Sequence, residues 1–125
     1  MIATLAAWHA RHEDAARALA GVTALPSHVA IEAYSVLTRM PAGLAVAPGD
    51  AVAVLRRRFP DQSLTLGAKD RRRLVERLAE AGVFGGATYD GLVALEAHAG
   101  GRRLLTLDRR AQETYRRLGV AFDAL

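Results

Sequence analysis

The sequence predicts one α/β domain in which helices flank a mostly parallel sheet. Two observations predict this class: stretches with helical spacing of apolar residues alternate with short apolar runs, and glycine or proline marks most boundaries between them. With 125 residues, 51% of them hydrophobic, the chain is long enough to bury one core. It has no repeat and no long linker, so residues 1–125 are expected to form a single domain.

The first half of the chain predicts three helices and one strand. A helix is expected over Leu5–Ala20, followed by a short strand at Val22–Leu25 that Pro26 ends. The next helix covers Ser27–Met40, with its first residue as the N-cap. Another helix, Pro48–Phe59, begins at a proline. It is expected to form a hairpin with the helix Ser27–Met40.

The second half predicts three helices and three strands, separated by glycines. Gly82 ends a strongly basic helix, and two glycine pairs, at 85–86 and 100–101, bound the helix between them. The helices are expected at Ala68–Ala81, Ala87–Ala99 and Arg109–Leu118, and the strands at Ser63–Leu66, Arg103–Leu107 and Val120–Phe122.

Composition limits the classes of function. The absence of cysteine excludes disulfides, thiolate zinc sites and thiol nucleophiles, and fits a reducing cytoplasm. No apolar run is long enough for a membrane span, and the first residues do not resemble a signal peptide. The net charge is +4, and all but one of the 17 basic residues are arginine. An acidic or polyanionic partner follows from this charge, although an arginine-rich coding bias predicts the same composition.

Three carboxylates lie where apolar or small residues would be ordinary. Glu32 falls within the apolar stripe of its predicted helix, and Asp90 lies among the small residues of another. Asp108 ends a predicted buried strand, on the same face as Thr106. Buried carboxylates are costly unless they are paired, hydrogen-bonded or bound to metal. A divalent cation shared at the carboxyl edge of the sheet explains all three at once.

Each acid also has an ordinary structural explanation. Asp108 is suited to be the N-cap of the helix that follows it. Asp90 lies in the first turn of its helix, where the helix dipole favours an acid. Glu32 has an ordinary explanation only if Arg39 or another arginine forms a buried ion pair with it.

Four passages together resemble the PIN-domain nucleases, specifically the VapC-type toxins of bacterial toxin–antitoxin pairs. They cover nearly the whole chain and run in the family's order: AAWHARHEDAARAL, LPSHVAIEAYSVLTRMP, GGATYDGLVALEAHAGGRRLLTLDRR and LGVAFDAL. The resemblance implies a PIN-like three-layer fold and a site where acidic residues bind Mg²⁺ or Mn²⁺. Carried over by motif, the acids are Glu32 in AIEAYSVLTR, Asp90 in YDGLVA and Asp108 in LLTLDRR, with Thr106 as a supporting hydroxyl.

The family's first acid has no counterpart in this sequence. In the family it ends an amino-terminal strand in the middle of the sheet, upstream of the passage that aligns with residues 1–5. The resemblance therefore implies that the central strand and one ligand are missing. The expected explanation is that the natural protein begins upstream; the alternative is a genuine loss of function.

The resemblance implies a Mg²⁺- or Mn²⁺-dependent endoribonuclease toxin that hydrolyses RNA phosphodiester bonds. It further implies a cognate antitoxin protein as partner and a homodimer. The composition, and not the resemblance, predicts a cytoplasmic location without membrane contact. The alternative is a catalytically impaired, truncated PIN domain that binds antitoxin or RNA without cutting. Metal-dependent stabilisation is expected to separate the two.

Overall fold

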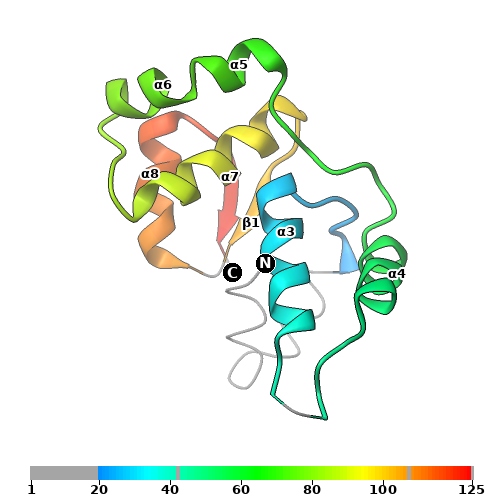
Figure 1. Ribbon diagram of the computed structural model, residues 1–125. Helices are drawn as coiled ribbons and strands as arrows, with labels where there is room; N and C mark the ends of the chain where they lie inside the picture. Colours follow the sequence, from blue (N-terminus) through cyan, green and yellow to red (C-terminus); the bar gives the residue numbers. More distant parts are fainter. Residues whose placement is uncertain (1–19, 42, 107, 125) are drawn as a thin grey trace.

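The structure is a computed structural model that describes residues 20–41, 43–106 and 108–124. Two parallel strands pack against α8, and α3 lies between α4 and α7 (Figure 1). The helix expected at Leu5–Ala20 lies outside the described residues apart from its last residue. The elements are α3 (Ser27–Thr38), α4 (Pro48–Arg58), α5 (Ala68–Arg72), α6 (Leu74–Glu80), α7 (Ala87–Ala99), β1 (Leu104–Thr106), α8 (Arg109–Leu118) and β2 (Phe122–Ala124).

Helices α7 and α8 have the bounds that the sequence predicts. Gly86 is the residue before α7, and Gly100 follows its last turn. Asp108 caps α8 at its start, and Gly119 ends it in the left-handed conformation with φ of 68°. Both helices are delimited by local signals, which explains why their ends can be predicted.

The prediction that Ser27 caps α3 is wrong. Pro26 occupies the N-cap position, and Ser27 is the first residue of the helix. The Ser27 hydroxyl instead donates a hydrogen bond to the carboxylate of Glu96 on α7. The helix also ends at Thr38, two residues before the expected Met40.

The strands expected at Val22–Leu25 and Ser63–Leu66 are reduced to one parallel bridge between Pro26 and Leu64. The N–H of Leu64 donates to the Leu25 carbonyl at 2.9 Å, and the N–H of Ser27 donates to the Leu64 carbonyl at 2.8 Å. Helix α3 begins immediately after Pro26, so the pairing cannot continue beyond this bridge.

The predicted basic helix Ala68–Ala81 is interrupted at Arg73. This residue has φ of −97° and ψ of 6°, outside the helical range. Its N–H lies within hydrogen-bond distance of the carbonyls of both Lys69 and Asp70, at 3.3 and 3.2 Å. The stretch therefore forms two short helices, α5 and α6, instead of one.

The last strand is displaced by two residues from the predicted Val120–Phe122. Phe122 pairs with Leu104, which places the strand at Phe122–Ala124, parallel to β1. Val120 is only 4% exposed and packs in the core before the strand begins. Its apolar character therefore reflects burial and not strand pairing.

The core lies between α6, α7, α8 and the two strands. Helix α7 passes α6 closely at Gly91, where an added Cβ would lie 2.6 Å from Leu78 Cδ2 and 3.2 Å from Val83 Cγ1. Any side chain at position 91 would require these neighbours to move. The buried members are Leu78, Val83, Ala94, Ala97, Leu104, Ala111, Tyr115, Leu118 and Val120.

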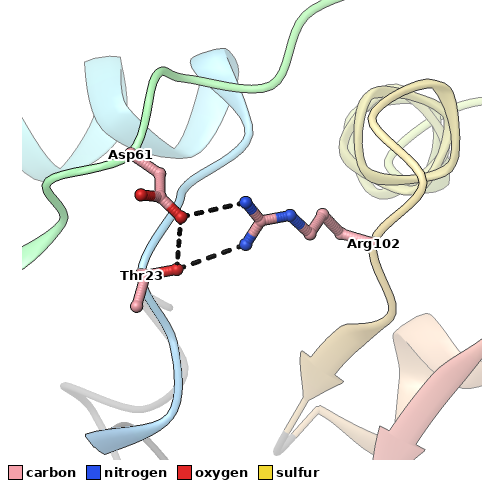
Figure 2. A network of polar contacts seen from close by, with 3 residues as sticks. All are labelled: Thr23, Asp61 and Arg102. Carbon is pink, nitrogen blue, oxygen red and sulfur yellow. Dashed lines mark hydrogen bonds and ion pairs between the residues drawn. The ribbon is translucent and has the colours of Figure 1, made fainter.

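A polar network joins three segments that are far apart in the sequence (Figure 2). Asp61 Oδ2 accepts hydrogen bonds from Thr23 Oγ1 at 2.6 Å and from an Arg102 guanidinium nitrogen at 2.9 Å. The Thr23 hydrogen bond and then Arg102 lower the pKa of Asp61. The network ties the segment before α3 to the residues that precede β1.

Within the described ranges, no helix is long and apolar enough to cross a membrane. The described strands form a small parallel sheet between helices, as the α/β prediction requires. The missing central strand, which the family resemblance implied, stays a prediction.

Candidate functional site

A cavity of about 490 Å³ lies between residues 21–26 and residues 102–106. Glu32 reaches it from α3, Asp90 from α7, and Asp108 from the start of α8. Thr106, at the end of β1, also lines it. The structure therefore brings all four residues selected from the sequence to one cavity.

Asp90 is the acid most affected by its surroundings. Burial raises the pKa of its carboxyl, and the negative charges of Asp108 and Glu32 raise it further. Asp108 and Glu32 are thus each close enough to Asp90 to repel its ionised carboxylate. A positive charge placed in the cavity would offset this repulsion.

Asp108 has two roles in the structure. One of its carboxylate oxygens, Oδ1, accepts a hydrogen bond from the N–H of Arg110 at 2.9 Å, as an N-cap does. The N–H of Asp108 donates to Thr106 Oγ1 at 3.0 Å, which fixes the backbone next to the carboxylate. The capping explanation is therefore observed, and it coexists with a place on the cavity wall.

Glu32 is less buried than its place in the apolar stripe suggests. Its side chain is 42% exposed, whereas its neighbour Ala33 is almost completely buried. Its partner is His28, one turn earlier, with Nε2 2.6 Å from Glu32 Oε1. The ordinary explanation for Glu32 named an arginine as its partner, and the structure gives it a histidine, which lies four residues earlier on the same face of α3.

His28 also links α3 to the helix that carries Asp90. Its imidazole stacks on the ring of Tyr89, with centroids 5.4 Å apart and planes 11° from parallel. Sequence reasoning missed this residue. The available signal was the i,i+4 spacing of His28 and Glu32.

Tyr115 on α8 is a further cavity residue that sequence reasoning missed. Its ring is buried, and it lines the cavity together with Thr106. Burial raises the pKa of the phenol to about 12, so it remains protonated at neutral pH. The signal in the sequence was its place beside Ala111 and Leu118 on the apolar face of a helix that is otherwise strongly polar.

The donor set suits a hard divalent cation in type. Three carboxylates and a threonine hydroxyl supply the oxygen ligands that Mg²⁺ and Mn²⁺ prefer. In the part of the chain that is described, however, no three acidic or histidine side chains are grouped closely enough to hold one ion. An ion bound directly by all three acids therefore requires them to move together, whereas Mg²⁺ bound by fewer carboxylates completes its coordination with water.

Comparison with known proteins decides the family. A family model described as PIN domain matches residues 1–117. The chain belongs to the PIN-domain family. Its relatives place it among the VapC-type PIN proteins, as the motifs around Glu32, Asp90 and Asp108 predicted.

Two relatives of this PIN-domain protein come from Mycobacterium tuberculosis. Ribonuclease VapC40 is 48% identical over 123 residues, which cover 98% of this chain and 92% of the relative. Ribonuclease VapC27 is 41% identical over 118 residues, which cover 94% of this chain and 79% of the relative. No solved structure matches the chain.

Replacing Asp90 by Asn should stabilise this PIN domain at neutral pH in the absence of metal. The folded-state pKa of Asp90 lies above its ordinary value of 3.8, so its ionised form destabilises the folded state. This penalty is complete above the folded-state pKa and disappears as the pH falls below 3.8. Thermal unfolding in chelator at several pH values measures it; an equal or lower midpoint for Asp90→Asn at pH 7 would contradict the expectation.

Proposed function

We propose that this PIN-domain protein is a metal-dependent endoribonuclease, the toxin of a toxin–antitoxin pair. The observation that carries the proposal is that three carboxylates from three separate elements line one cavity. The relatives that are 48% and 41% identical are both named ribonucleases, which supports RNA as the substrate.

In this proposal Glu32, Asp90 and Asp108 hold Mg²⁺ or Mn²⁺ in the cavity. A bound divalent ion lowers the pKa of an attacking water and stabilises the charge that develops on a phosphodiester. Thr106 keeps Asp108 in place through its hydrogen bond to the backbone N–H of Asp108. Tyr115 lines the same cavity, and its phenol stays protonated at neutral pH.

The proposed protein partner is an antitoxin that covers the cavity and blocks access of RNA. The support is the similarity to proteins named VapC. The arrangement as a homodimer stays a prediction from the family resemblance.

A second candidate function is binding of antitoxin or RNA without cleavage. One observation favours it: in the described ranges no three acidic or histidine side chains are grouped around one possible ion position. The two candidates agree on the fold and the partners. They differ in whether the cavity binds a metal ion that supports RNA cleavage.

Thermal unfolding with and without added metal tests the proposal. A ligand that binds only the folded state at about 100 times its Kd stabilises that state by about 2.7 kcal/mol. We therefore expect Mn²⁺ or Mg²⁺ to raise the unfolding midpoint, and chelator to abolish cleavage of a labelled RNA pool.

Two results would contradict the metal-dependent nuclease. Cleavage that persists in chelator would exclude the metal mechanism. An unfolding midpoint that metal does not change, together with RNA binding but no cleavage, would favour the second candidate. Calcium is a useful control, because it is also a hard cation but needs a larger and more flexible set of oxygen ligands.

A further inference from the structure

We propose that Glu96 is a positioning residue, which fixes Glu32 on α3 relative to Asp90 on α7. The inference rests on the proposed function, because it concerns the metal affinity of the same cavity. Glu96 lies on α7, six residues after Asp90, but it is absent from the residues that line the cavity. Its effect on the site must therefore pass through other residues.

Glu96 is unusual because it is a carboxylate with no exposed surface. Among the described residues it is the largest side chain that is fully buried. Its Oε2 accepts a hydrogen bond from the Ser27 hydroxyl, and its Oε1 accepts one from the backbone N–H of His28 at 3.0 Å. Both donors belong to the first turn of α3.

These contacts make Glu96 the cap of a helix to which it does not belong. The first N–H groups of a helix have no partner within the helix, and Pro26 at the N-cap has no polar side chain to serve them. The positive end of the α3 dipole and two hydrogen bonds stabilise a carboxylate that burial alone would disfavour. The pairing therefore fixes the start of α3 against the side of α7.

His28 transmits this position to the cavity. Its N–H binds Glu96, its Nε2 lies 2.6 Å from the Glu32 carboxylate, and its ring stacks on Tyr89, the neighbour of Asp90. Glu32 lies five residues after Ser27, slightly more than one helical turn. Loss of the Glu96 carboxylate would free the first turn of α3 and shift Glu32 relative to Asp90.

The test measures Mn²⁺ affinity of the folded protein, at a temperature well below each variant's unfolding midpoint. Electron paramagnetic resonance of free Mn²⁺ gives the affinity without requiring RNA cleavage. The variants are Glu96→Ala, Glu96→Gln and Ser27→Ala. Gln keeps one carbonyl acceptor and a comparable shape. Glu80→Gln, at the exposed end of α6, is the matched control.

We expect Glu96→Ala to weaken Mn²⁺ binding about 10-fold, the lower end of the range for residues that orient metal ligands. Ser27→Ala and Glu96→Gln should weaken it less, and Glu80→Gln should leave it unchanged. A purely structural role would lower the unfolding midpoint but leave the affinity of the folded protein as in the parent.

Parent-like Mn²⁺ affinity in folded Glu96→Ala would overturn the inference and leave the proposed function intact. If Glu96→Ala does not fold, parent-like affinity in both Ser27→Ala and Glu96→Gln would overturn it equally. A parent protein that binds no Mn²⁺ would overturn the proposed function, and this inference with it.

Discussion

Asp90→Asn should reduce RNA cleavage by more than about 100-fold while the protein remains folded. Changing a group that only orients a metal ligand costs about 10- to 100-fold, and a proposed ligand should cost more. The substitution keeps the size of the side chain but removes its charge. Burial, and then the other two acids, raise the pKa of this carboxyl. Single-turnover cleavage with and without added Mn²⁺ measures the effect.

The control for Asp90→Asn is Asp70→Asn, the same change at an exposed position in the first turn of α5. It should cleave RNA at the parent rate. If the Asp90→Asn protein is more stable than the parent but does not cleave RNA, then the Asp90 carboxylate lowers folding stability and is needed for cleavage. Parent-like cleavage by Asp90→Asn would remove Asp90 from the site.

Two substitutions of Asp108 should separate capping from metal binding. Asp108→Ala removes the acceptor for the Arg110 N–H and should cost about 1 kcal/mol of unfolding free energy, whereas Asn is a good N-cap and should cost little. If the carboxylate binds metal, both variants should lose cleavage by more than about 100-fold. Denaturant unfolding and cleavage rates, measured on the same preparations, give the two quantities.

The opposite pattern would identify Asp108 as a cap alone. In that case Asp108→Asn would cleave RNA like the parent, and only Asp108→Ala would be less stable. The Thr106 hydrogen bond to the Asp108 backbone is retained in both variants, so it does not complicate the comparison.

The parts of the fold that the sequence predicts are those with local boundaries. Helix α8 begins at a capping aspartate and ends at a left-handed glycine, and both signals are visible without the structure. Strand pairing depends on segments that are distant in the sequence, so Val120 was assigned to a strand although it is a core residue. The helix breaks at Arg73 because this residue has a non-helical backbone conformation. No glycine or proline in the segment predicts that conformation.

The residues of the candidate site likewise fall into those that the sequence predicts and those that only the structure shows. The acids were found because their placement on apolar or small-residue faces is unusual and because their motifs resemble a family. Glu96 and Ser27 are 69 residues apart, and their contact exists only when α3 packs on α7. Tyr115 likewise resembles an ordinary core residue until the structure places it on the wall of the cavity.

The glycine after Asp90 has a consequence for how loss-of-function variants should be interpreted. Glycine within a helix costs about 1 kcal/mol relative to alanine, so α7 depends on its neighbours to remain helical at this point. Those neighbours include Leu78 and Val83, which would collide with a side chain at position 91. Larger side chains at these two core positions would press on Gly91 and displace the backbone next to Asp90. A screen for inactive variants would therefore return residues of α6 and of the turn after it, none of which touches the cavity.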